Sequence, residues 1–180
     1  PTCKPCWSGH FCPRGAAAPL PCAGGSYSSA TEKAAHADCT PVSAGYFAPT
    51  GSTNQTACAK GTFTDAAKAV KNGCDACPGG EFQDAIGQTS CKPCIQGAYC
   101  PLGAAAPLPC KGGSYSSATH NSAPADCTKC PAGAACAIGS TQHTLCSPGT
   151  TSASEGTSEC GPCDGGEVSD ESGGTAGKAR

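Results

Sequence analysis

Cysteine is the residue type in this chain with the greatest capacity for chemistry, and 18 of the 180 residues are cysteine. Ten of them form C-x-x-C pairs, a spacing shared by zinc ligands, redox dithiols and disulfide frameworks. The pairs are Cys3–Cys6, Cys74–Cys77, Cys91–Cys94, Cys127–Cys130 and Cys160–Cys163. The second pair followed by the third comes close to the spacing of a zinc ribbon.

Metal binding and redox catalysis are both disfavoured by the surroundings of these pairs. The same spacing recurs throughout an array with many further cysteines, and no histidine lies near the double pair. A reactive thiolate needs a helix N-terminus or a cationic neighbour, and no helical pattern follows any pair. The histidines are scattered, and we expect them to be solvent-exposed: His10, His36, His120 and His143. We therefore expect no catalytic residue, no metal and no cofactor, and a chain that is not an enzyme.

The composition indicates that disulfides order this chain. Leu, Ile, Val and Phe together number 14, far below the roughly 20 % that a packed core requires. Each disulfide that closes a loop of about 15 residues removes about 3 kcal/mol of denatured-state entropy. Because disulfides persist in oxidising compartments, we expect a secreted, extracellular protein. The net charge of −2 disfavours nucleic acid as a partner, and no apolar run is long enough to insert into a membrane.

The elements that position the cysteines are repeated. Residues 3–40 and 91–128 align without a gap and agree at 28 of 38 positions. The alignment continues, with one two-residue gap, to the end of the second copy. We predict two cysteine-rich long repeats, 1–88 and 89–176, and a linker or tail at 177–180.

Shorter motifs recur inside each long repeat. The first is C-x-x-G-[ST]-[YF]-[ST], which begins at Cys22, Cys58 and Cys110, with weaker versions at Cys77, Cys146 and Cys163. The second is C-x-x-G-x-x-C-[PA]-x-G, which begins at Cys6, Cys94 and Cys130. Glycine followed by Ser/Thr and an aromatic residue predicts a turn entering a short strand. The fold class is therefore a small disulfide-rich repeat array with short β-strand pairs and little helix.

The aromatic residues of these motifs are expected to pack rather than bind. Tyr27, Tyr115, Phe63 and Phe82 hold one place in the first motif. Trp7, the single tryptophan, corresponds to Ile95. Their recurrence together with the cysteines favours packing against a disulfide or a neighbouring unit.

One pair of cysteines in the second long repeat is missing from the first. Cys130 corresponds to Val42 and Cys136 to Ala48, whereas the surrounding cysteines are kept. Two cysteines lost together are most simply a bonded pair, because losing one would leave a reactive thiol. This predicts the short disulfides Cys6–Cys12, Cys94–Cys100 and Cys130–Cys136.

Sequence alone leaves the pairing of the other twelve cysteines open. A ladder of neighbours gives loops of 13 to 16 residues and is preferred: Cys22–Cys39, Cys58–Cys74, Cys77–Cys91, Cys110–Cys127 and Cys146–Cys160. A rival scheme pairs Cys3–Cys22, Cys39–Cys58, Cys91–Cys110 and Cys127–Cys146. The rival leaves four cysteines that would need cramped C-x-x-C bonds or long-range partners.

The ladder leaves Cys3 and Cys163 without partners. Cys163 opens a motif that has no closing cysteine, and Cys3 is a closing cysteine without an opening one. Both are candidates for bonds between units: either the array continues in a longer chain, or Cys163 of one copy bonds Cys3 of the next.

The C-x-x-C pairs joined to the first motif resemble the cysteine-rich repeats of ephrin-receptor-like and TNF-receptor-like extracellular modules. The C-P-x-G ending of the second motif resembles versions found in surface proteins of algae and other protists. The resemblance covers nearly the whole chain and implies an elongated rod of stacked cysteine-rich modules. The departures are Val42, Ala48 and Thr151, where units are expected to pack less well.

Polar segments complete the sequence picture. Asn54 lies in the one clear N-x-[ST] sequon, which predicts a glycoprotein. The acidic residues Glu167, Asp170 and Glu171 indicate a solvated tail rather than a calcium site.

Near-identical repeats and unmatched end cysteines favour a structural protein of an extracellular fibre, matrix or surface appendage. Its expected partner is itself, or neighbouring repeats of a longer chain, because identical contacts that do not close give filaments. The alternative is the ligand-binding stalk or ectodomain of a cell-surface receptor.

Overall fold

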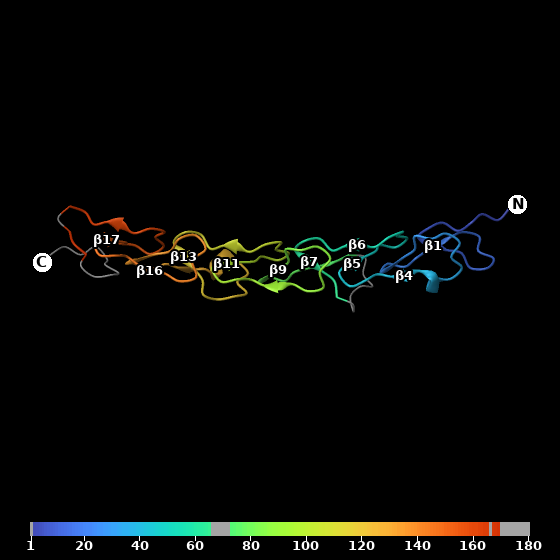
Figure 1. Ribbon diagram of the computed structural model, residues 1–180, viewed down its shortest axis with the longest axis horizontal. Coiled ribbons are helices and arrows are strands. Elements are labelled where there is room, and N and C mark those ends of the chain that lie inside the picture. The colour runs from blue at the N-terminus through green and yellow to red at the C-terminus, as the bar shows by residue number, and fades with distance from the viewer. Residues whose placement is uncertain (1, 66–72, 166, 170–180) are drawn as a thin grey trace. The chain divides into compact units, whose positions relative to one another are not determined.

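The computed structural model describes residues 2–65, 73–165 and 167–169, and its described part is built from very short antiparallel strand pairs (Figure 1). The pairs are β1 (His10–Phe11) with β2 (Leu20–Pro21), β3 (Ser26–Tyr27) with β4 (Thr40–Pro41), β5 (Tyr46–Phe47) with β6 (Thr56–Ala57), β7 (Thr62–Phe63) with β8 (Asp75–Ala76), β9 (Glu81–Phe82) with β10 (Lys92–Pro93), β11 (Ala98–Tyr99) with β12 (Leu108–Pro109), β13 (Ser114–Tyr115) with β14 (Thr128–Lys129), β15 (Ala134–Ala135) with β16 (Thr144–Leu145), and β17 (Thr150–Thr151) with β18 (Gly161–Pro162). Helix is confined, in the described ranges, to the 3₁₀ turns η1 (His36–Asp38) and η2 (Pro124–Asp126). The expected small disulfide-rich fold with strand pairs is therefore present.

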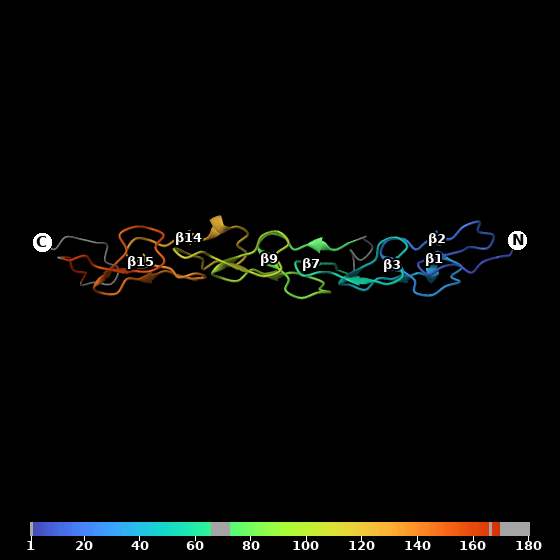
Figure 2. The same cartoon turned by 90° about the horizontal axis from the view of Figure 1, so that it is seen from above.

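The chain divides into two compact units. The first comprises residues 1–77 and 83–91 and holds β1 to β8, and the second comprises residues 78–82 and 92–180 and holds β9 to β18. Inside each unit the strand pairs follow one another in chain order, as both views show (Figures 1 and 2). The predicted long repeats 1–88 and 89–176 are units of sequence and stay a prediction.

Each hairpin begins at a glycine that we call the turn glycine, the fourth residue of either motif. Gly113 is representative: its φ of 83° is one that other residues rarely adopt. The hydroxyl of the following residue, Ser114, donates to the carbonyl of Lys111 at 2.7 Å. Ser26, Thr62 and Thr150 make the same bond to the carbonyl three residues earlier. The Ser/Thr of the first motif therefore closes the turn.

Two backbone hydrogen bonds tie each turn glycine to the chain beyond its hairpin: one to the residue directly after the hairpin, and one to the residue that follows the next strand. The N–H of Gly25 donates to the carbonyl of Ala48 at 2.8 Å, and its carbonyl accepts from the N–H of Val42 at 3.0 Å. The same two bonds occur at Gly113, which pairs with Cys136 and Cys130. They recur at the other turn glycines of the described residues: Gly9, Gly45, Gly61, Gly80, Gly97, Gly133 and Gly149. Backbone groups that such short strands would leave unpaired are satisfied in this way.

The buried apolar side chains are mainly half-cystines. Cys22, Cys58, Cys77, Cys100 and Cys110 have no exposed surface. Apolar clusters are small, and one of them joins Phe82 and Ala104 to three neighbours of the β11–β12 hairpin. Sulfur thus takes the place of the large apolar residues that the composition lacks.

Candidate functional site: the cystines and the free cysteines

Eight disulfides join sixteen of the eighteen cysteines. They are Cys6–Cys12, Cys22–Cys39, Cys58–Cys74, Cys77–Cys91, Cys94–Cys100, Cys110–Cys127, Cys130–Cys136 and Cys146–Cys160. The Cα atoms of each pair lie 5.7 to 5.9 Å apart, a distance suited to a disulfide. These are the short bonds and the ladder expected from the sequence, and the bonds of the rival scheme are not formed.

The disulfides are of two kinds, and in both the first cysteine has the same position relative to the hairpin. In both kinds the first cysteine lies three residues before a turn glycine. The short kind, such as Cys94–Cys100, spans six residues and ends directly after the first strand of its hairpin. The long kind, such as Cys110–Cys127, spans 14 to 17 residues and ends directly before the second strand. Each bond therefore staples one hairpin.

The hairpin without a staple is closed by an apolar contact. Val42 is 8 % exposed and Ala48 is fully buried, and Tyr27 packs against them. At the corresponding place in the second long repeat, Tyr115 packs against Cys130 and Cys136. The expectation that this unit packs less well is not supported at Val42 and Ala48, because both side chains are buried.

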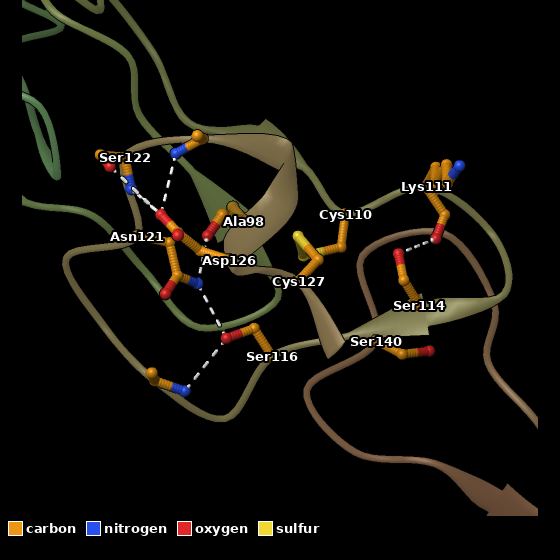
Figure 3. The surroundings of a disulfide bond; sticks show 12 residues. Ala98, Cys110, Lys111, Ser114, Ser116, Asn121, Ser122, Asp126, Cys127 and Ser140 are labelled. Atoms are coloured by element: carbon orange, nitrogen blue, oxygen red, sulfur yellow. Dashed lines mark hydrogen bonds between the residues drawn. A yellow bond between two sulfur atoms is a disulfide. The ribbon is translucent and has the colours of Figure 1, made fainter. Parts of the chain in front are cut away.

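The loop spanned by Cys110–Cys127 is held by polar side chains (Figure 3). The buried Asn121 amide donates to the carbonyl of Ala98 at 3.0 Å and to the Ser116 hydroxyl at 2.8 Å. The carboxylate of Asp126 accepts from the N–H groups of Ser122 and Ala123. These bonds lower the pKa of Asp126, because they stabilise the charged form.

The sequence did not predict the role of the Asn121 side chain, and the repeat comparison explains why. The corresponding residue of the first long repeat is Lys33, so the repeat comparison hides the amide. The backbone role is shared, since the carbonyls of Lys33 and Asn121 accept from the N–H of Cys12 and Cys100 respectively, both at 2.8 Å. The carboxylate of Asp38, the counterpart of Asp126, accepts from the N–H groups of residues 34 and 35, and these bonds lower its pKa.

The aromatic residues divide into packed and exposed members. Phe82 is 9 % exposed, Tyr27 and Tyr115 pack on apolar clusters, and Phe63 is half-buried. The expectation of packing is wrong for Trp7, which is 63 % exposed. Its ring lies edge-on to the ring of His10, with 6.0 Å between the ring centroids. Its counterpart Ile95 is 55 % exposed as well, so this position of the second motif faces solvent in both long repeats.

The two cysteines outside the disulfides are Cys3, which is exposed, and Cys163, which is half-buried. The structure does not bring them together in a disulfide. Their roles between units stay a prediction. Asn54 is exposed in the loop between β5 and β6, and its glycosylation stays a prediction as well.

Other sequence candidates are placed apart from one another. His36 lies edge-on to Phe11, and His143 lies edge-on to Tyr115. His120 shares a hydrogen bond of 3.1 Å with the Thr119 hydroxyl. No cluster of three or more potential metal ligands occurs in residues 2–65, 73–165 and 167–169. Glu167 is half-buried, whereas Asp170 and Glu171 lie outside the described residues.

Comparison with known proteins adds no relative to this picture. No model of a known protein family matches the chain, and no curated protein matches it either. Within the described residues, no helix is long and apolar enough to cross a membrane.

Proposed function

We propose that this chain is a structural segment of an extracellular fibre, matrix or surface appendage, and that its hairpins stack into a rod that associates end to end. One observation carries the proposal. Each turn glycine in the described residues makes the same two backbone hydrogen bonds to residues beyond its hairpin, at 2.7 to 3.1 Å. Such contacts use only backbone atoms that every copy of the motif presents, so a stack of this kind has no built-in stopping point.

The eight disulfides support an extracellular location. Cystines of this number are stable where the surroundings are oxidising. They also suit a mechanical role, because eight of the nine described hairpins are closed covalently and resist unravelling under tension. We propose on the same grounds that the chain is related in architecture to the ephrin-receptor-like and TNF-receptor-like repeats, is not an enzyme, and carries a glycan at the exposed Asn54.

Electron microscopy of native material, labelled with antibodies against residues 105–130, tests the proposed function. The expected result is label at regular intervals along fibres or surface appendages outside the cell. Label confined to the plasma membrane without any fibre would contradict it.

The alternative function is a ligand-binding stalk or ectodomain of a receptor. The observation that favours it is the set of exposed large apolar side chains, since such residues mark binding surfaces when they cluster. They include Trp7, Ile86, Leu102 and Ile138, which are 63 to 75 % exposed. A transmembrane helix or kinase domain encoded in the same gene would support the receptor.

A further inference from the structure

The first hairpin presents a hollow whose counterpart in the second long repeat is covered. The hollow has a volume of about 500 Å³, and its lining includes Cys3, Lys4, Trp7, Ala16 and Pro19. Residues 3–22 correspond to residues 91–110 at an offset of 88. Two matched surfaces with nearly the same sequence can therefore be compared directly.

The counterpart surface is covered by Phe82. This side chain packs with Cys100 and Ala104, and Phe82 and Ala104 form a parallel β-bridge. Ala104 is 7 % exposed and Cys100 is fully buried. The corresponding residues of the first hairpin are Ala16, which is exposed, and Cys12, which is half-buried. The first hairpin therefore lacks the cover that Phe82 provides at the β11–β12 hairpin.

The residue that corresponds to Phe82 in the last motif is itself uncovered. Residues 163–169 correspond to residues 77–83 at an offset of 86, which places Val168 at the position of Phe82. Val168 is 67 % exposed, whereas Phe82 is 9 % exposed. The last motif thus has an exposed apolar side chain, Val168, that covers no surface. The first motif has a hollow that no apolar side chain covers.

The two free cysteines correspond to a bonded pair in the middle of the chain. Cys163 corresponds to Cys77 and Cys3 corresponds to Cys91. Cys77 and Cys91 are joined to each other by a disulfide. The two thiols left in this chain are therefore the two halves of a bond that the chain already makes once.

We propose that the hollow binds the last motif of a second copy of this sequence, whose Val168 side chain packs on Ala16, and that Cys163 of that copy forms a disulfide with Cys3. The paired strands β9 and β10 align Phe82 with Lys92 and Glu81 with Pro93. By the same register, Val168 of the docking copy aligns with Lys4 and Glu167 aligns with Pro5. This inference deepens the proposed function by naming its end-to-end contact and rests on that function.

The bond forms by thiol–disulfide exchange with oxidised glutathione, or with a disulfide of the same chemical class. The Cys163 thiolate attacks one sulfur of glutathione disulfide and releases one glutathione thiolate. The Cys3 thiolate of the other copy then attacks the Cys163 sulfur and releases the second. One disulfide forms for one reduced, and the two electrons and two protons of the cysteine thiols end on two molecules of glutathione.

The test uses two single variants of the full chain. Cys3→Ser keeps the Cys163 thiol and Cys163→Ser keeps the Cys3 thiol, so the proposed bond can form only between the two variants. In a glutathione redox buffer, an equimolar mixture should give a mixed dimer well above its statistical share. Mass spectrometry should find the Cys3 peptide linked to the Cys163 peptide. A statistical mixture of dimers, no dimer, or native protein with Cys3 joined to another cysteine would overturn the proposal.

A second set of variants, each made in the Cys3→Ser chain, tests the docking itself. Val168→Asp should slow formation of the mixed dimer about tenfold, since an apolar contact is lost. Val168→Phe, which restores the residue found at position 82, should accelerate it. The matched control is Ile138→Asp, which changes an exposed apolar side chain outside the proposed contact and should leave the rate unchanged. Equal rates for all three variants would mean that the thiols meet by collision alone.

The outcomes separate this junction from the proposed function. Fibres in native material with no mixed dimer would leave the structural role standing and show that this junction is wrong. A mixed dimer without fibres in native material would support this junction and contradict the proposed structural role.

Discussion

The carbonyl oxygen of Gly156 lies where a Cβ atom on Gly113 would have to be. Gly113 opens the β13–β14 hairpin, and Gly156 lies in the loop of the β17–β18 hairpin. The same relationship joins Gly97 to Gly139 in the second unit and Gly45 to Gly87 in the first. At these three places the backbone of one hairpin therefore lies against the backbone of the hairpin two places further along the chain.

The first prediction concerns that close approach. Gly113→Ala should destabilise the fold by about 2–4 kcal/mol, since a backbone overlap is added to an unfavourable φ. Gly149→Ala is the matched control: its φ of 82° equals that of Gly113 within a degree, and no described atom lies within 4 Å of its added Cβ. The control should cost about 1 kcal/mol. Urea unfolding with intact disulfides measures both, and equal losses would contradict the close approach.

A second prediction concerns Glu32 and His120, which have φ values of 62° and 64°. Their N–H groups donate to the carbonyls of Cys6 and Cys94, as the N–H groups of Gly51 and Gly139 donate to Cys22 and Cys110. Each thus occupies a left-handed position that other hairpins give to glycine.

Replacing either residue by glycine should raise stability by about 0.5–1 kcal/mol, because the left-handed strain is relieved. The control is Glu155→Gly, directly before Gly156, the glycine that holds the corresponding left-handed position. Glu155 itself has no positive φ, so this change should lower stability through the added freedom of the unfolded chain. Thermal unfolding measures all three variants. A loss of stability in Glu32→Gly and His120→Gly would show that the conformation is not strained.

The third prediction concerns the hairpin that has no disulfide. The double change Val42→Cys and Ala48→Cys should form a disulfide equivalent to Cys130–Cys136, since Ala48 and Val42 are already packed together. The gain should reach at most about 2 kcal/mol, because the loop is short. Thiol titration and peptide mapping check the bond. The single change Val42→Cys is the control, and two free thiols in the double variant would contradict the equivalence of the two hairpins.

The fourth prediction concerns pH. Backbone N–H groups lower the pKa values of Asp38 and Asp126 in the folded chain. A carboxyl whose pKa is lower when folded stabilises the fold above its unfolded pKa, which is about 4. This contribution is lost as the pH falls through the lower folded value. Stability should therefore decrease as the solution is taken from about pH 5 to about pH 2.

The double change Asp38→Asn and Asp126→Asn should reduce that decrease, and urea unfolding at several pH values measures it. The control is Glu159→Gln, which removes one exposed negative charge outside the loops that hold Asp38 and Asp126. An identical profile in the double variant and the unaltered chain would show that the two loop carboxylates do not stabilise the fold.

Much of the local structure could be predicted from sequence because the motifs are repeated. The joint loss of the residues corresponding to Cys130 and Cys136 identifies the short disulfides, and loop length identifies the long ones. Both inferences concern bonds between residues close in the chain, where spacing limits the choices.

Contacts between hairpins could not be predicted in this way. The approach of Gly113 to Gly156 depends on where two hairpins lie in space, and a glycine in a turn motif has the same appearance whether or not another backbone touches it. The exposure of Trp7 was missed for a related reason: an apolar residue that recurs at one position of a motif has a repeated environment, but recurrence does not say whether that environment is buried.

The proposed rod of stacked hairpins is tested most directly by small-angle X-ray scattering from the Cys3→Ser, Cys163→Ser double variant, in which the end-to-end bond cannot form. A compact globule of this length has a radius of gyration of about 16 Å. A stack in which every hairpin contacts only the next two should give a value well above that, with the scattering profile of a rod. A radius of gyration near that of the globule would contradict the stack and the fibre role built on it.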